Sequence, residues 1–293
     1  MTRPVSYFWP DISLLFAATM WGIFWYPLRL FESAGMSALW VTMIAFLTTS
    51  IIGLVYTAKL WPQYLIKPKT LTLIALTAGW CNVAFLVAVV EGNVIRVILL
   101  FYLSPIWTVI LGHFILKETI SFKAFLIFLV AFAGAMIMLW EPNMGFPWPQ
   151  GLADWLAISA GFGFAFSNVL IRSLQQVSIP VKTTASWLGC VGITAVWIVF
   201  AQDVVPDIMP VTWMSSIALG LFGIVFMTLS VQYGITHMPV YRSAIILLFE
   251  IIVTAVSAYW LANETMNSRE WVGGIMVGLS ALLVAREGKQ HEQ

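Results

Sequence analysis

VIRVILLFYLSPIWTVILGHFILKET (residues 94–119) and VYRSAIILLFEIIVTAVSAYWLANET (residues 240–265) carry the same pattern, offset by 146 positions without a gap. The matched pairs are Val94 with Val240, Arg96 with Arg242, Ile106 with Ile252, Thr108 with Thr254, Glu118 with Glu264, and Thr119 with Thr265. Apolar matches arise easily by chance, but two Arg and two Glu residues at one spacing indicate an internal duplication. The 22 residues from Arg to Glu would form a helix of about 33 Å, which is close to the bilayer's hydrocarbon thickness. Each copy is therefore predicted to span a membrane, with a cation at one end and a carboxylate at the other.

The composition indicates a polytopic, all-α membrane protein. Hydrophobic residues make up 61% of the chain and charged residues only 9%, with a mean hydropathy of +0.93, whereas soluble domains contain about 25% charged residues. The net charge of +1 gives no argument for a nucleic-acid partner. Cys81 and Cys190 lie inside apolar runs, which favours small buried side chains over a disulfide or a metal site. The apolar run from Ile12 to Leu30 is interpreted as an uncleaved first span.

Apolar runs of about 20 residues, bounded by charges, Pro or Gly, predict ten transmembrane helices. Their expected ranges are 11–30, 37–58, 70–90, 94–116, 121–140, 153–173, 181–201, 211–235, 240–261 and 269–285. The connections are too short for an extramembrane domain. The polar stretch at 141–152 separates five helices from five, which predicts an N-terminal repeat over 1–141 and a C-terminal repeat over 142–293 within one membrane domain.

The distribution of basic residues predicts the orientation. With ten spans, 11 of the 14 Lys and Arg residues fall on the side of the termini, and the opposite side keeps only Arg29, Arg96 and Arg269. By the positive-inside rule, both termini of this multi-pass protein are expected in the cytoplasm. The expected location, which the charge distribution does not itself indicate, is a bacterial inner membrane.

Because five is an odd number, the second repeat is expected to lie upside down relative to the first. A weaker similarity at an offset of 143 pairs Trp21 with Phe164, Gly22 with Ala165, Trp25 with Asn168, and Arg29 with Arg172. Inverted repeats of this kind place a substrate site near the bilayer midplane, between the two halves. We therefore expect a central cavity there.

Glu250 is the most informative single residue, since it lies midway along the ninth predicted helix. A charged side chain at that depth costs about 2.5 kcal/mol or more. Glu250 is expected to couple transport to protons or to pair with a cationic group; the alternative is a protonated acid that is hydrogen-bonded to a neighbouring helix. Its repeat partner is Ser104, beside Pro105, which removes a backbone hydrogen bond and predicts either a kink that opens onto the cavity or a packing kink.

Aromatic side chains and a few polar ones are predicted to line the cavity. Trp21 and Trp25 share a helix face at i, i+4, as do Phe164 and Asn168. The full predicted set is Trp21, Trp25, Trp80, Asn82, Tyr102, Ser104, Phe164, Asn168, Leu248 and Glu250. The alternatives are core packing or lipid contact for the aromatic residues and interhelical hydrogen bonding for the two asparagines. Glu118 and Glu264 are expected to cap or stabilise the tight turn into the next helix.

Catalytic signatures are missing from the sequence. It contains no H-E-x-x-H, no G-x-S-x-G, no P-loop and no cluster of His, Cys and Asp. We therefore expect no enzymatic activity, no cofactor and no bound metal.

The chain resembles the EamA-type exporters of the drug/metabolite transporter superfamily, which have ten helices in two inverted repeats. The motifs that carry the resemblance are Met20-Trp-Gly22, Tyr102-Leu-Ser-Pro105, Leu116-Lys-Glu-Thr119 and the A-N-E-T of residues 262–265. Relatives often have Glu-Pro at the middle of the duplicated helix; here the first copy has Ser104-Pro105 and the second Glu250-Ile251. The Y-L-S-P motif is most similar to the Tyr-Leu-Trp-Pro of aromatic amino acid and amphiphile exporters. That similarity implies that Tyr102 and Ser104 line the cavity with Trp21, Trp80 and Phe164.

The resulting hypothesis is a secondary transporter that exports a small metabolite by alternating access, working in the bilayer as a monomer or homodimer. An amino acid, an amine or an aromatic compound is the expected substrate, with protons as a candidate coupling ion. The alternatives are an uncoupled facilitator, in which Glu250 is only structural, and a membrane-embedded enzyme or receptor.

Overall fold

A computed structural model describes residues 7–140, 148–262 and 266–290, and its regular elements in these ranges are all helical. Ten helical spans are long and apolar enough to cross a membrane, which confirms the predicted number. Their edges agree with the predicted ones to within a few residues; the first span, for example, covers Phe8–Ser33 instead of 11–30. The boundary expected between residues 141 and 142 lies outside the described residues.

Five spans are single unbroken helices, and the other five are built from two or three consecutive pieces. The unbroken ones are α5 (Pro68–Glu91), α8 (Phe122–Leu139), α9 (Leu152–Ser173), α10 (Ile179–Ala201) and α15 (Ser268–Gln290). In the first half, the composite spans are α1 (Phe8–Ile23) with α2 (Trp25–Ser33), then α3 (Ala38–Thr57) with η1 (Ala58–Leu60) and α4 (Trp61–Tyr64), and then α6 (Val94–Phe101) with α7 (Ser104–Leu111) and the π-helical η2 (Gly112–Leu116). In the second half, they are α11 (Pro210–Ala218) with the π-helical η4 (Leu219–Ile224) and α12 (Val225–His237), and α13 (Val240–Leu247) with α14 (Phe249–Leu261).

The local sequence explains where several of these helices start. Ser37, Asn93 and Ser121 are N-cap residues, and each side chain accepts a hydrogen bond from the backbone N–H three residues later. Pro68 and Pro210 are the first residues of α5 and α11, where a missing N–H does no harm. These residues fix where each helix begins.

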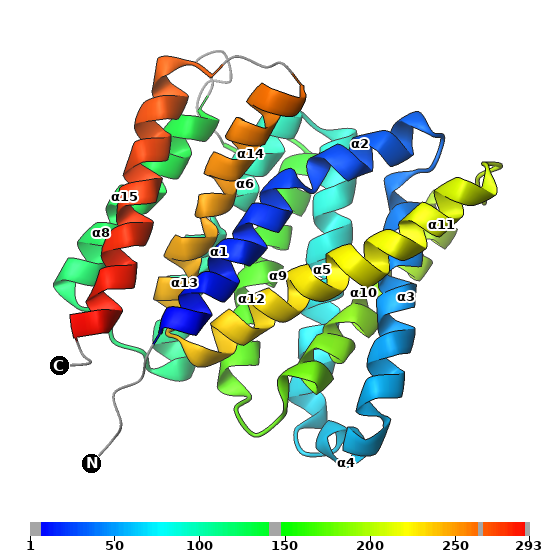
Figure 1. Ribbon diagram of the computed structural model, residues 1–293, viewed down its shortest axis with the longest axis horizontal. Helices are drawn as coiled ribbons and strands as arrows, with labels where there is room; N and C mark the ends of the chain where they lie inside the picture. Colours follow the sequence, from blue (N-terminus) through cyan, green and yellow to red (C-terminus); the bar gives the residue numbers. More distant parts are fainter. Residues whose placement is uncertain (1–6, 141–147, 263–265, 291–293) are drawn as a thin grey trace.

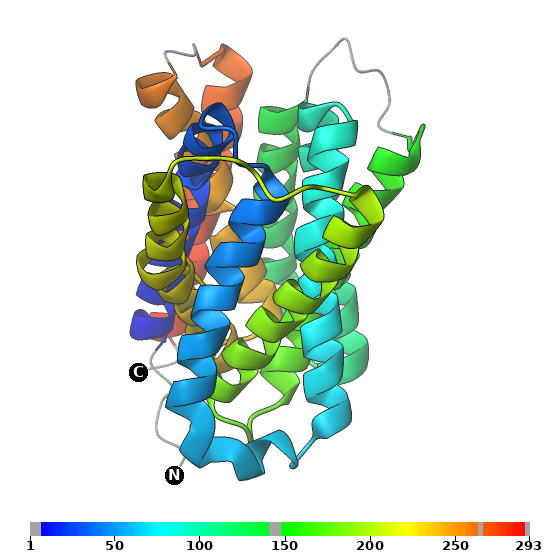
Figure 2. The ribbon, with the colours of Figure 1, turned by 90° about the vertical axis from the view of Figure 1, so that its right-hand side faces the viewer.

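The ten spans form a single bundle (Figures 1 and 2), and the second five-helix half is inverted relative to the first. The first span begins and the last span ends at the same face, drawn at the bottom of Figure 1, which we call the terminal face; the opposite one is the far face. The duplicated helices cross in opposite senses, because α6 starts at the far face and α13 at the terminal face. This arrangement confirms the inverted five-helix repeats.

Both duplicated helices break at the same position. α6 and α13 are each 8 residues long and start 146 positions apart, and the breaks follow at Tyr102 and at Leu248. In the first copy Pro105 has no N–H to donate, and the chain tightens so that Ile106 N donates to Leu103 O at 3.0 Å. The second copy makes the same kind of tight turn without proline, since Ile251 N donates to Leu248 O at 3.1 Å. The broken helix is therefore a property of both repeats.

Helices from the two halves approach closely where glycines face each other. On α10, a side chain at Gly189 would collide with the backbone carbonyl of Ala75 on α5, and one at Gly79 would meet the carbonyl of Gly189. A second pair, Gly134 on α8 and Gly273 on α15, joins the fifth and tenth spans in the same way. In a bilayer, association depends on such close backbone packing, because lipid is as apolar as the side chains.

Replacing Gly189 with Ala is therefore expected to destabilise the bundle, since the new methyl group has no space next to the Ala75 carbonyl. Overpacking of this kind costs about 1–3 kcal/mol. The matched control is Gly192→Ala on the same helix, where nothing lies within 4 Å of the new methyl group. Thermal unfolding of the purified protein in detergent should show a lower midpoint for Gly189→Ala only; equal midpoints for the two variants would contradict this packing.

Candidate functional site

The breaks in the two duplicated helices bring Tyr102 and Glu250 together. Tyr102 lies between α6 and α7, and Glu250 is the second residue of α14. The Tyr102 hydroxyl donates a hydrogen bond to the Glu250 carboxylate, so one residue from each half meets midway along the spans. Glu250 is half-buried. Two members of the predicted cavity are thus direct neighbours.

The first span completes the surroundings of Glu250. A Cβ at Gly22 of α1 would lie 2.8 Å from the Glu250 carbonyl oxygen and 2.7 Å from Val253 Cβ, so only glycine allows this approach. One turn further along, the Ser257 hydroxyl shares its proton between Thr254 O at 2.9 Å and Gly22 O at 3.2 Å, and it accepts from the indole N–H of Trp25 at 2.9 Å. Trp25 is therefore hydrogen-bonded to α14 about two turns beyond Glu250.

The other predicted aromatic residues are half-buried at helix contacts. The ring of Trp21 packs edge-on against Phe24 at 5.2 Å, and the ring of Phe164 lies 5.8 Å from that of Phe101. The indole N–H of Trp80 donates to Ser159 Oγ at 3.2 Å. The three rings belong to three different helices: Trp21 to α1, Trp80 to α5 and Phe164 to α9.

Three of the four remaining predicted residues are more deeply buried, and the fourth, Asn82, is half-buried. Ser104 is 2% exposed and Leu248 is 1% exposed, and Leu248 belongs to an apolar cluster with Ile251. Asn82 donates to Cys190 Sγ at 3.3 Å. Asn168 is 6% exposed, and its amide makes no hydrogen bond to the described part of the chain.

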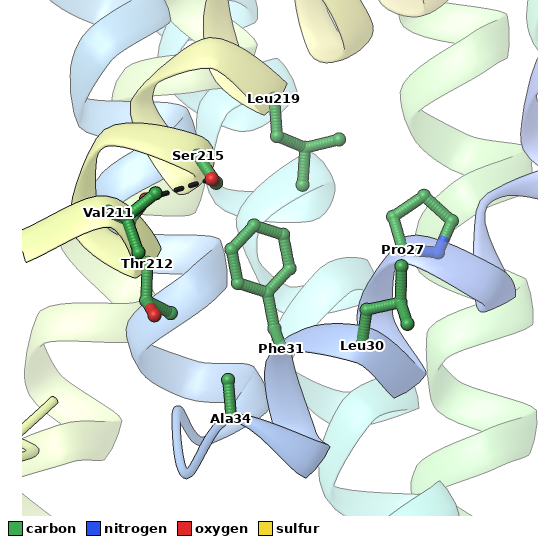
Figure 3. A pocket seen from close by; sticks show the side chains of 8 residues that line it. All are labelled: Pro27, Leu30, Phe31, Ala34, Val211, Thr212, Ser215 and Leu219. Atoms are coloured by element: carbon green, nitrogen blue, oxygen red, sulfur yellow. Dashed lines mark hydrogen bonds between the residues drawn. The ribbon is translucent and has the colours of Figure 1, made fainter. Parts of the chain in front are cut away.

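A pocket of about 350 Å³ lies away from this centre, between α2 and α11 (Figure 3). Its wall is mainly apolar, and the lining residues are Pro27, Leu30, Phe31, Ala34, Val211, Thr212, Ser215 and Leu219. None of the predicted cavity residues lines it. It is a groove between the first and eighth spans in the half of the bundle next to the far face.

Two buried ion pairs cross between the halves, one near each face. Near the far face, Arg96 Nε of α6 donates to Asp154 Oδ2 of α9 at 2.7 Å, and the same guanidinium also donates to the Trp148 carbonyl. Near the terminal face, Arg242 of α13 pairs with both carboxylate oxygens of Asp11 on α1, at 3.1 and 2.6 Å. The four side chains are each at most 12% exposed. Each repeat therefore supplies one Arg and one Asp, and both pairs join one half to the other.

Sequence reasoning identified the repeated arginines but missed their partners. The signal was present, because Asp11 and Asp154 are related by the same offset of 143 that relates Trp21 to Phe164. Both aspartates lie in the first turn of a span. In a sequence, a charge at this place is taken as the end of the membrane-spanning segment, and not as one member of a buried ion pair.

Glu118 has a different role from the expected one. Its Oε2 accepts from Val240 N at 2.9 Å, and its Oε1 accepts from Arg172 Nε at 3.4 Å. It therefore caps α13 in the other half, whereas the next helix of its own half, α8, is capped by Ser121. The expectation that Glu118 caps the turn into the following helix is wrong, because the inverted packing brings the start of α13 closer. Glu264 lies outside the described residues.

Ten spans in two inverted halves, with polar groups buried where the halves meet, define a membrane transporter fold. The profile of the EamA-like transporter family matches residues 8–140 and 151–286, and the chain belongs to this family. The two matched segments correspond to the two repeats, in agreement with the drug/metabolite transporter resemblance.

Individual relatives agree with this assignment. The chain is 25% identical over 206 residues to the uncharacterized transporter sll1164 of Synechocystis, a match that covers 67% of this chain and 59% of that protein. It is 22% identical over 209 residues to an uncharacterized transporter of Archaeoglobus fulgidus, covering 70% and 72% of the two chains. A solved crystal structure has the same fold, with a TM-score of 0.74 at 16% identity over 96% of this chain and 98% of that one.

Breaking one of the crossed ion pairs should destabilise the protein strongly. Asp154→Asn leaves the Arg96 charge buried without its partner, which costs about 3–5 kcal/mol. The double variant Arg96→Met, Asp154→Leu removes both charges and is expected to recover most of that loss. Thermal unfolding in detergent measures both effects. Arg269→Gln, at an exposed arginine of the far face, is the control; a loss equal to that of Asp154→Asn would show that the buried pair has no special role.

Proposed function

We propose that the protein is a secondary transporter that binds a small metabolite between its two halves and moves it by alternating access. The Glu250–Tyr102 contact is the observation that carries this proposal. An ionisable side chain in the middle of a span is expensive unless it faces a polar cavity or changes its protonation. This one lies at the break of a duplicated helix, where freed backbone groups add polarity.

Glu250 is assigned the role of binding a proton or a cationic group of the solute, with Tyr102 holding the carboxylate in place. Trp21, Trp25, Trp80 and Phe164 would supply aromatic contact area around the same centre. These rings favour an amino acid, an amine or an aromatic compound as the solute, because ring faces bind flat surfaces and cations.

The crossed ion pairs support alternating access. Each pair joins the two halves near one face, and the two pairs are equivalent under the repeat. A rocking motion of one half against the other would separate one pair while the other remains closed. This gives two related conformations of similar energy, which transport by alternating access requires.

We assign the terminal face to the cytoplasm of a bacterial inner membrane, with export as the direction. The charge bias supports this orientation: it persists after the buried Lys182 and Arg242 at the terminal face and the buried Arg96 at the far face are excluded.

An uncoupled facilitator is the second candidate, and the Tyr102 hydrogen bond itself favours it. A carboxylate that is fully used in holding α7 against α14 would need no proton exchange during transport. Measured coupling to a pH gradient separates the two functions.

Replacing Glu250 with Gln should abolish stimulation of transport by a pH gradient in proteoliposomes loaded with a panel of amino acids and amines. The neutral amide keeps the shape but loses the charge. Affinity for cationic solutes should fall by roughly 10-fold to 100-fold, as for the loss of a hydrogen bond to a charged group. Tyr102→Phe should produce a smaller loss in the same direction.

Glu32→Gln, at an exposed glutamate on α2, is the matched control and should behave like the parent. Saturable transport that ignores the pH gradient in both the parent and Glu250→Gln would establish the facilitator. No transport of any panel solute by the parent would refute both candidates for these substrate classes.

A further inference from the structure

Lys182 is a cation buried among three helices of the second half. It lies in the first turn of α10, near the terminal face, and it is 0% exposed. Its ammonium donates to the Ile171 carbonyl of α9 at 3.1 Å and to Thr236 Oγ1 of α12 at 2.9 Å. An ammonium has three N–H donors and no acceptor, so a third donor remains.

The charge of Lys182 has no carboxylate partner among the described residues. The nearby charged group is Arg172, which is also a cation and is paired with Glu118. The local sum of Lys182, Arg172 and Glu118 is therefore one buried positive charge. Burying a charge without a counter-charge is costly, and the described structure offers this ammonium only two neutral oxygen acceptors.

A second layer of polar side chains lies one helical turn further into the bundle. Ser186 follows Lys182 by four residues, Asn168 precedes Arg172 by four, and Gln232 precedes Thr236 by four. Gln232 Nε2 donates to Ser186 Oγ at 3.3 Å, while its Oε1 is buried and accepts no hydrogen bond from the described residues. Asn168 shares a face of α9 with Arg172, whose guanidinium reaches the Thr236 carbonyl at 2.6 Å.

A purely structural role explains this arrangement poorly. Neutral side chains can join these helices, as Trp187 Nε1 of α10 does by donating to Thr228 Oγ1 of α12 at 2.9 Å. The first repeat supports this view: when the N-cap residues Ser37 and Ser178 are aligned, Lys182 corresponds to the buried Val41. The fold is therefore built with an apolar residue at this position in the other half.

We infer that Lys182 binds the carboxylate of the transported solute, and that Asn168 and Gln232 bind an adjacent polar group. The inference rests on the proposed transport function and narrows its substrate class to carboxylate-bearing solutes, amino acids in particular. In the described conformation the site is closed, and Thr236 occupies one donor of the ammonium. When α12 separates from α9 and α10, the carboxylate replaces the Thr236 hydroxyl and neutralises the buried charge.

The test compares acids with amines that lack only the carboxylate: phenylalanine with phenethylamine, and tryptophan with tryptamine. Binding to the purified protein is measured by the shift in thermal unfolding, and transport is measured in proteoliposomes. Lys182→Gln should weaken binding of the acids by about 10-fold or more and leave the amines unchanged. Lys182→Arg should retain part of the affinity, and Lys59→Gln, at an exposed lysine of the same face, should match the parent.

A second variant reports on the charge itself. Thr236→Asp places a carboxylate where the hydroxyl now contacts Lys182. It should raise the unfolding midpoint by pairing the buried cation, and it should abolish binding of the acids. A structural ammonium that is already satisfied by its neutral partners predicts the opposite, because the added carboxylate would then be buried at a cost.

Equal effects of Lys182→Gln on acids and amines, no effect on either, or a lower midpoint for Thr236→Asp would each overturn the assignment. So would a parent protein that binds and transports amines but no acids; in that case the proposed transport function stands without this site. Acids that bind the parent through Lys182 but never cross the liposome membrane give the reverse result: they support the site and refute transport.

Discussion

The structure depends on a constraint that the bilayer imposes on its buried arginines: each needs a carboxylate partner, and the partner comes from the other half of the chain. Arg96 pairs with Asp154, and Arg242 pairs with Asp11. In the described structure, neither arginine takes its carboxylate partner from its own repeat. Each pair therefore joins the two halves, and one ion pair near each face helps to hold them in register.

Backbone contact supplies the second constraint. Glycines allow helices of opposite halves to approach at backbone carbonyl groups: Gly22 lies against the Glu250 carbonyl, and Gly161 lies against the Phe101 carbonyl. The Phe101 carbonyl is also the one left without a helical donor, because Pro105 has no N–H. The contact at Glu250 has a functional consequence, because it holds the break in the ninth span against the first span. The carboxylate is thus held at the junction of both halves, where Tyr102 can reach it.

Periodicity and duplication predicted the ten spans and the inverted repeats, because these features depend on residues that are close in sequence. The ion-pair partners could not be predicted in the same way, since pairing depends on the rotation and depth of helices that are far apart in the chain. The predicted spans 11–30 and 181–201 place Asp11 and Lys182 at span ends, and only tertiary packing shows that both are buried. The sequence grouped Tyr102 and Glu250 in one cavity without predicting their direct contact. It also gave no indication of the groove between α2 and α11, which depends on the tilt of two helices.

The comparison of the repeats separates scaffold from function. Residues that repeat, such as Arg96 and Arg242 with their aspartates, hold the halves together, and each repeat contributes the same kinds of residue to this contact. Glu250 corresponds to Ser104 and Lys182 to Val41, so each charged group has a neutral counterpart in the first half. Both unmatched charges belong to the second half, one midway along the ninth span and the other near the terminal face. Because symmetric scaffolding cannot by itself distinguish one side of the membrane from the other, this unequal distribution of charge is where solute selectivity and direction can arise.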